Sequence, residues 1–302
     1  MRRFLRTTLS DLSYRAIRLT NGHHTGLRIL TYHRVNDWHP EDLLSVPVGR
    51  FREQMEYLVA NGWRVIPLTD AVEQLSKANG VTSDKLQVTS DSAPAPRPPG
   101  PPLTRAGAGT PPASQKVVVI TFDDGYADNY WQAYPILREH EFPATLFVAS
   151  GLMDRHEPMP RYVTGTVQHD RGLSWNEIRT MQAGGIEIGA HSMTHADLTA
   201  LSLADARREI AGSKRQIEQE TGRAVSAFAY PKGRLNAQVV RLVREAGFMS
   251  GCSEHVGANQ PGEDLYRLRR TEISGFDTIE DFEKKLAGAY DWLHRTVQLT
   301  TR

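Results

Sequence analysis

The chain has 302 residues, 39% hydrophobic and 24% charged, so it is long enough for one large hydrophobic core or two ordinary ones. Lys and Arg number 36 against 35 Asp and Glu, and this formal net charge of +1 argues against nucleic acid as a partner. The single cysteine, Cys252, excludes an intrachain disulfide framework and a multi-cysteine metal site, and we expect its side chain to be buried or half-buried.

The first 22 residues combine apolar side chains at helical spacing with five arginines. Two interpretations stand beside each other: a helix packed on the domain, or a basic amphipathic helix that lies on an anionic membrane surface. The segment lacks the apolar core of about 7 to 15 residues of a secretion signal, and no stretch approaches the roughly 20 apolar residues of a membrane span. We therefore expect a cytoplasmic protein, with peripheral contact at the inner membrane face as one alternative.

Short apolar runs alternate with helical segments along the rest of the chain. This pattern predicts a parallel sheet that is buried on both faces, and seven or eight such units favour an α/β fold of the (β/α) barrel type over an open sheet. The expected strands cover residues 27–32, 64–67, 116–122, 144–149, 186–190, 227–230, 248–251 and 268–273. The expected helices include residues 50–61, 202–221 and 237–246, the last closed by Gly247.

A proline-rich segment interrupts this pattern. Eight of the 17 prolines fall between residues 91 and 112, with almost no large apolar side chain among them. Such a composition cannot bury enough surface to offset the entropy of ordering, so we expect a disordered insertion at 78–115. The sequence thus predicts one barrel domain over residues 23–290, interrupted by this insertion and followed by a tail at 291–302.

Two adjacent carboxylates, Asp123 and Asp124, follow the apolar run of the third expected strand, and Gly125 permits a sharp turn after them. Sites in parallel barrels are built at the carboxyl ends of the strands. An Asp at such a turn is also a common helix N-cap, so these two residues alone leave both interpretations open.

Two histidines, His191 and His195, follow the fifth expected strand at a spacing of four. If the segment turns helically, both rings reach one metal ion, although isolated histidine pairs are also common as surface or hydrogen-bonded core residues. A carboxylate and two imidazoles at separate strand ends form the ligand set that leaves positions for water and substrate. A second carboxylate beside them can accept a proton, as a metal-assisted hydrolysis requires.

Two further strands end in candidate residues. Tyr230 and Pro231 begin a turn in which a backbone N–H can point at a developing oxyanion, although Tyr230 can equally be a core side chain. His33 follows the first expected strand, where a catalytic role and a structural hydrogen bond are both open.

The TFDDG block at 121–125 and the HSMTH block at 191–195, in that order, resemble the first two motifs of the NodB-type polysaccharide deacetylases, carbohydrate esterase family 4. The surroundings FPATLFV at 142–148 and LSWNEI at 173–178 are also similar to the family. The resemblance covers roughly residues 27–72 and 116–275. It implies a deformed barrel of β/α units that hydrolyses the N-acetyl group of an amino sugar with a divalent metal, zinc before cobalt, nickel or manganese.

Carried over by position, the resemblance implies Asp123 as general base and Asp124, His191 and His195 as metal ligands. It implies that the backbone N–H of Tyr230 helps to bind the oxyanion.

Two departures from the family pattern are visible. Ala229 stands where many members have an arginine that orients the base, with Lys232 and Arg234 as candidate replacements, and the late segment 265–270 lacks the family's histidine. FAYPKG together with the early YHRV is more similar to members that act on bacterial exopolysaccharides, which makes His33 the candidate acid.

The sequence therefore predicts a deacetylase of N-acetylhexosamine units in a bacterial polysaccharide or its precursor. Trp175, Tyr126 and Pro231 are candidates for contacts with the sugar, with core packing as the alternative. Two rival functions remain: a non-catalytic carbohydrate-binding barrel, which the two departures favour, and a non-haem iron oxygenase, which uses the same ligand set.

Overall fold

The computed structural model describes residues 14, 26–78, 116–162 and 165–291. The expected amphipathic segment at 1–22 apart from Tyr14, the insertion apart from Ala78, and the tail after Asp291 lie outside the described residues.

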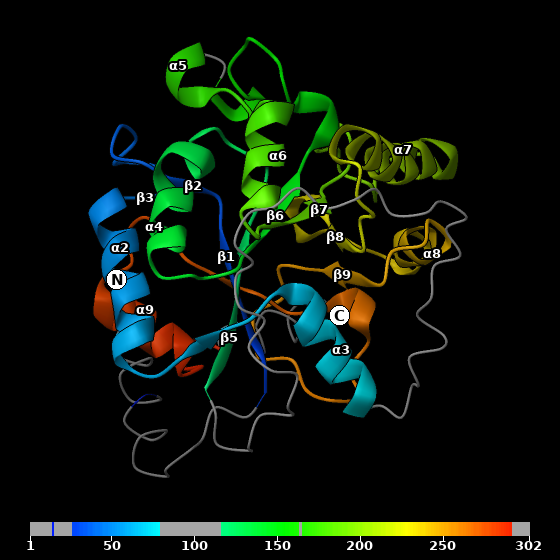
Figure 1. Cartoon of the computed structure of the whole chain (residues 1–302). Coiled ribbons are helices and arrows are strands. Elements are labelled where there is room, and N and C mark those ends of the chain that lie inside the picture. The colour runs from blue at the N-terminus through cyan, green and yellow to red at the C-terminus, as the bar shows by residue number, and fades with distance from the viewer. Residues whose placement is uncertain (1–13, 15–25, 79–115, 163–164, 292–302) are drawn as a thin grey trace, which may run out of the picture.

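Seven parallel strands follow one another in the order β10-β1-β5-β6-β7-β8-β9, and the short β4 pairs with the start of β5 (Figure 1). The two outer strands are joined by a parallel bridge between Cys252 of β9 and Leu268, three residues before β10. The Leu268 N–H donates to the Gly251 carbonyl at 2.8 Å, and its carbonyl accepts from the Ser253 N–H at 2.8 Å. Through these contacts the sheet curves back on itself. The predicted deformed (β/α) barrel is therefore confirmed. The strands of the barrel are β1 (Arg28–Tyr32), β4 (Arg64–Val65), β5 (Val117–Phe122), β6 (Thr145–Val148), β7 (Glu187–Ala190), β8 (Ala227–Ala229), β9 (Ser250–Cys252) and β10 (Thr271–Glu272); β2 (Arg34–Val35) and β3 (Ser45–Val46) form a separate pair.

Most helices lie around the outside of the sheet (Figure 1). Their ends follow local capping chemistry: Ser202 accepts a hydrogen bond from the third backbone amide of α7, and Gly222, at φ 67°, ends that helix. The helices are α2 (Val48–Ala60), α3 (Leu68–Ala78), α4 (Tyr134–Glu139), α5 (Val167–Asp170), α6 (Trp175–Ala183), α7 (Leu203–Thr221), α8 (Ala237–Glu245) and α9 (Ile279–Leu286). Shorter turns are η2 (Asn129–Ala133), η3 (Ser150–Leu152), η4 (Pro160–Tyr162), η5 (Pro231–Gly233) and η6 (Leu265–Arg267).

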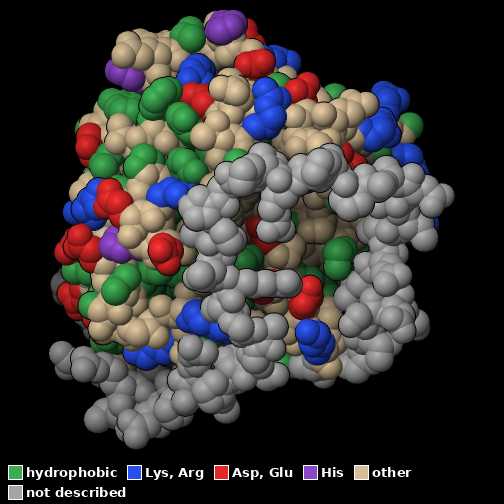
Figure 2. Space-filling model, in the orientation of Figure 1, with side chains coloured by type: hydrophobic (Ala, Val, Ile, Leu, Met, Phe, Trp, Pro, Cys, Tyr) green, Lys and Arg blue, Asp and Glu red, His purple; other side chains and the backbone are tan. Residues whose placement is uncertain are grey.

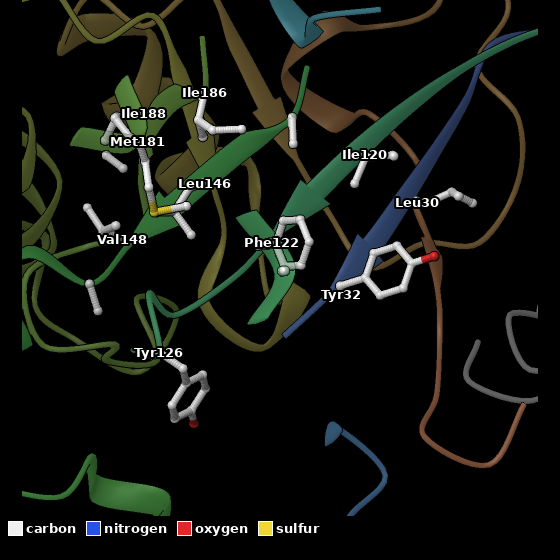
Figure 3. Packing of buried hydrophobic residues seen from close by; sticks show 14 of the residues in the cluster. Leu30, Tyr32, Ile120, Phe122, Tyr126, Leu146, Val148, Met181, Ile186 and Ile188 are labelled. Atoms are coloured by element: carbon white, nitrogen blue, oxygen red, sulfur yellow. The ribbon is translucent and has the colours of Figure 1, made fainter. Parts of the chain in front are cut away.

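Alternate residues of β1, β5, β6 and β8 belong to two separate hydrophobic clusters. The larger cluster packs the outer face of the strands against the surrounding helices, and Figure 3 shows its members Leu30, Tyr32, Ile120, Phe122 and Leu146 on one side of the sheet. The smaller cluster contains the residues that alternate with them, such as Ile29, Val119 and Phe147, together with Leu68, Ala71, Val72 and Leu75 of α3. The inner face of the barrel is therefore filled by side chains, and α3 closes one end of it.

The start of α3 marks which end is closed. The backbone amide of Leu68 donates to the carboxylate of Glu187, the first residue of β7, at 3.1 Å. The opposite end, at the carboxyl termini of the strands, is the mouth of the barrel.

On the face that Figure 2 shows, basic and acidic side chains are interspersed, so neither sign of charge dominates there. Among the described residues, no helix is both long and apolar enough to span a membrane.

Candidate metal centre

Asp123 and Asp124 follow β5 directly and lie at the mouth. Asp123 continues the alternation of the strand and points inward with 0% exposure. Asp124 has φ 74°, a left-handed conformation that L residues rarely adopt, and remains 8% exposed. This change of direction brings two successive carboxylates to the same place.

His191 and His195 meet Asp124 at the mouth. The Nε2 atoms of the two imidazoles lie 3.5 Å and 3.4 Å from Asp124 Oδ1. One ligand atom from each of the three residues lies within 4.8 Å of the other two. The prediction that these side chains gather from separate strand ends thus agrees with the geometry.

The donor set fits a divalent metal in two independent respects. Asp124 Oδ1 is buried without a hydrogen-bond partner, an arrangement that is costly unless a cation binds the oxygen. The Nδ1 of His191 lies 2.8 Å from the Ala229 carbonyl, so the ring nitrogen that faces Asp124 is left free to act as a ligand. Two imidazoles and one carboxylate are ligands that zinc accepts.

The charges at the mouth favour ionised carboxylates. Burial alone would raise the pKa of Asp124, but the neighbouring His191, followed by His33 and His195, lowers it well below its usual range. Burial and the neighbouring His191 lower the pKa of His195 to about 4, so its imidazole is neutral near pH 7, as a metal ligand must be.

Arg270 holds the second carboxylate. Its guanidinium donates to both oxygens of Asp123, each at 2.7 Å, and both side chains are 1% exposed. Burial tends to raise the pKa of Asp123, but the charge of Arg270, followed by His191, outweighs burial and lowers it. Asp123 is therefore ionised at neutral pH and fixed in orientation by a two-point contact.

We expected Lys232 or Arg234 to replace the family's arginine beside Asp123. Arg270 makes this contact instead. Arg234 pairs with Asp197 at the surface, and Lys232 is exposed. Sequence reasoning quoted Arg270 only as part of a segment that lacks a histidine. The alternation Leu268 inward, Arg269 outward and Arg270 inward was the signal that could have identified it.

His33 lies between β1 and β2, half-buried, and its charge acts on both Asp123 and Asp124. The side-chain amide of Asn129 donates to its carbonyl at 2.9 Å, which fixes the backbone, whereas its Nδ1 is buried without a hydrogen-bond partner. His33 is thus at the mouth with one ring nitrogen uncommitted.

The structure does not support Tyr230 as an oxyanion donor. Its backbone N–H donates to the Cys252 carbonyl at 3.0 Å as part of the sheet, and its hydroxyl donates to the Tyr266 carbonyl at 2.9 Å. Tyr230 is fully buried, so the core-packing alternative describes it, and Pro231 beside it is buried as well.

Two of the expected sugar contacts are also core residues. Trp175 is 6% exposed within the outer hydrophobic cluster, where it begins α6. Tyr126 is 2% exposed and covers the Arg34 guanidinium, whose carbon lies 4.7 Å from the ring centroid. Both side chains have therefore already buried the faces that a sugar ring would need.

Arg34, which directly follows His33, is a buried residue that the sequence reasoning missed. It is 0% exposed, donates to Asp128 at 2.7 Å and to Asp170 at 2.8 Å, and packs against the rings of Tyr126 and Tyr162. Asp170 is the last residue of α5. Arg34 therefore joins the chain after His33 to that helix.

Comparison with known proteins agrees with the motifs. Residues 110–251 match the sequence profile of the family described as polysaccharide deacetylase. YxkH of Bacillus subtilis (strain 168), named as a polysaccharide deacetylase, is 26% identical over 248 residues, which cover 82% of this chain and 71% of that protein. The poly-beta-1,6-N-acetyl-D-glucosamine N-deacetylase of Staphylococcus aureus (strain MRSA252) is 26% identical over 187 residues. That match covers 59% of this chain and 61% of the enzyme, less than two thirds of its length.

Solved structures share the fold. The Streptococcus pyogenes deacetylase PplD in complex with acetate has a TM-score of 0.65 and 21% identity, over 87% of this chain and 98% of that one. IcaB from Ammonifex degensii has a TM-score of 0.63 and 22% identity, over 88% of this chain and 97% of that one. The sequence profile and these relatives confirm the resemblance to the polysaccharide deacetylases that the motifs indicate, and the solved structures share the fold.

Proposed function

We propose that this protein is a metal-dependent hydrolase that removes acetyl groups from N-acetylhexosamine units of a bacterial polysaccharide or its precursor. The proposal rests on Asp124 Oδ1, which is buried without a hydrogen-bond partner and lies 3.5 Å and 3.4 Å from two imidazole nitrogens. Beside it lies a second carboxylate, that of Asp123, which Arg270 keeps ionised. The substrate class rests on the family and on the relative named as a poly-beta-1,6-N-acetyl-D-glucosamine deacetylase.

Asp124, His191 and His195 would hold the metal, and zinc is the first choice for this donor set. A metal bound there would polarise the amide carbonyl of the substrate and make water a stronger acid.

Asp123 supplies the general base. The nucleophilic water loses a proton to one of its carboxylate oxygens as the water attacks the acetyl carbon. Arg270 restricts rotation of this carboxylate, because both of its oxygens accept from the guanidinium. The base is thereby held in one orientation before substrate arrives.

His33 supplies the general acid in this proposal. The C–N bond breaks as the ring gives a proton to the departing sugar amine, which leaves as a neutral amine, and the acetic acid that forms loses its proton to solvent to give acetate. The uncommitted ring nitrogen of His33 and its place beside both carboxylates support this role.

The test is release of acetate from N-acetylglucosamine oligomers by the purified protein, with and without zinc or cobalt. We expect release that depends on the metal and is lost in Asp123→Asn, and that persists in Asp154→Asn, an exposed carboxylate of the same type. No release from metal-loaded protein would favour the carbohydrate-binding alternative, although Arg270 removes one of the two departures that suggested it. Release that persists in Asp123→Asn would retain the reaction and overturn the base.

A further inference from the structure

The loop that carries both candidate histidine ligands has an unusual backbone. Ser192 has φ 62° and His195 has φ 58°, and neither is glycine. L side chains rarely adopt this conformation, so the surrounding structure must hold the loop in place.

The polar backbone groups of this loop have partners on two sides. The carbonyls of Ser192 and Met193 accept from the amides of Ser150 and Gly151, at 3.1 Å and 2.8 Å. On the other side, a single carboxylate of α7 binds the amides. Glu209 Oε2 accepts from Met193 N–H at 2.8 Å and from Thr194 N–H at 2.9 Å. Glu209 Oε1 accepts from the Thr194 hydroxyl at 2.9 Å.

The same face of α7 supports the loop one and two turns further on. A Cβ at Gly212 would lie 2.4 Å from Met193 Sδ, so the glycine makes room for that side chain. Gln216 accepts from the Ser150 hydroxyl at 2.8 Å. Glu209, Gly212 and Gln216 are spaced by three and four residues, so they lie on one face of α7. This face contacts Ser150, Met193 and Thr194 beside the metal centre.

We propose that Glu209 is a positioning residue that sets the affinity of the metal centre by holding the loop between His191 and His195. Its carboxylate accepts hydrogen bonds from two backbone amides and one hydroxyl. A carboxylate forms stronger hydrogen bonds than a neutral acceptor does. Outer residues of this kind typically change metal affinity by about 10 to 100-fold when they are removed. The inference rests on the proposed metal site, because it concerns how that site is assembled.

The experiment measures the zinc dissociation constant by competition with a chelator, for the wild type and for Glu209→Ala, Glu209→Gln and Thr194→Val. We expect Glu209→Ala to weaken zinc binding by about 10 to 100-fold. Glu209→Gln should weaken it less, because the amide keeps one acceptor oxygen. Thr194→Val removes one hydrogen bond at an exposed position and should weaken binding by about 2 to 10-fold.

Glu220→Gln is the matched control, because Glu220 lies on the same helix, is exposed and pairs with Arg179 on the surface. It should leave the dissociation constant unchanged. Hydrogen exchange of the Met193 and Thr194 amides in zinc-free protein supplies a second readout, and exchange should be faster in both Glu209 variants.

Three results would count against the inference. Zinc dissociation constants within twofold of the wild type, in folded Glu209 variants, would overturn it and leave the metal site intact. A wild type that binds zinc no more tightly than His195→Gln would overturn the metal site and this inference with it. Should Glu209→Ala not fold, an unchanged dissociation constant in both Glu209→Gln and Thr194→Val would overturn the inference, and weakened binding in both would support it.

Discussion

Arg270 and Asp123 are separated by 147 positions in the sequence, yet they share two hydrogen bonds of 2.7 Å at the mouth of the barrel. The contact exists because β10 lies beside β1, and β1 lies beside β5. The proposed base, Asp123, is thus oriented by Arg270, which directly precedes the strand on the other side of β1, rather than by a residue near β8.

Removing this guanidinium should shift the pH dependence of the reaction. In the wild type the pKa of Asp123 is lowered, so this carboxylate is ionised at neutral pH and its protonation limits kcat/KM only on the acid side of the profile. In Arg270→Met the largest influence that opposes burial is lost and the pKa of Asp123 rises, so the acid limb of the kcat/KM profile should move to higher pH. We also expect kcat to fall by about 100-fold, because the carboxylate loses its fixed orientation.

Arg270→Lys keeps the positive charge and should leave the acid limb closer to that of the wild type. Arg269→Met changes the exposed neighbour and should alter neither the profile nor kcat. An acid limb that does not move in Arg270→Met would show that another group titrates there.

The role of His33 can be separated from metal binding. We expect His33→Gln to lower kcat by about 10² to 10⁴-fold, the usual contribution of a general acid, and to leave the zinc dissociation constant unchanged. A substrate with an activated anilide in place of the sugar amine should be hydrolysed with a smaller loss, since its leaving group needs less protonation.

His156→Gln, at an exposed position, is the control for replacement of a histidine. An equal loss on both substrates would argue that His33 has a different task.

Metal removal should lower the thermal stability. A ligand that binds only the folded state stabilises it by about 2.7 kcal/mol at a concentration 100 times its dissociation constant. We therefore expect zinc to raise the melting temperature of the wild type and a chelator to reverse this. Asp124→Asn should lose the response, whereas Asp154→Asn should keep it. A zinc response that survives in Asp124→Asn would place the metal elsewhere.

Arg34 should matter for folding more than for chemistry. Arg34→Met leaves Asp128 and Asp170, which are 1% and 2% exposed, without their cation. Removing one partner of a buried ion pair typically costs about 3 to 5 kcal/mol, and we expect a decrease of this size in the free energy of unfolding from urea titration.

Arg155→Met is the matched control, because Arg155 pairs with Glu157 where both are exposed, and it should change stability by less than about 0.5 kcal/mol. A similar small change in Arg34→Met would mean that the two aspartates find other partners.

The fold and the clustering of the candidate metal ligands were predictable from the sequence because each rests on a local pattern. Apolar runs alternating with helices indicated the strands, and Asp124 and His191 stand within two residues of the ends of such runs. Arg270 was not predictable in this way, because its role depends on which strands become neighbours when the barrel closes. Trp175 and Tyr126 were ambiguous for a related reason: an aromatic side chain suits a groove and a core equally well until its burial is known.

The division between the closed end and the mouth bears on how such a domain can evolve. α3 and the start of β5 belong to the closed end, whereas Asp123, His191 and His33 lie at the mouth. Added or deleted sequence between α3 and β5 therefore enters the fold a full strand length from the reacting groups. We expect relatives to differ freely in length at this junction, with natural selection acting on it almost independently of catalysis.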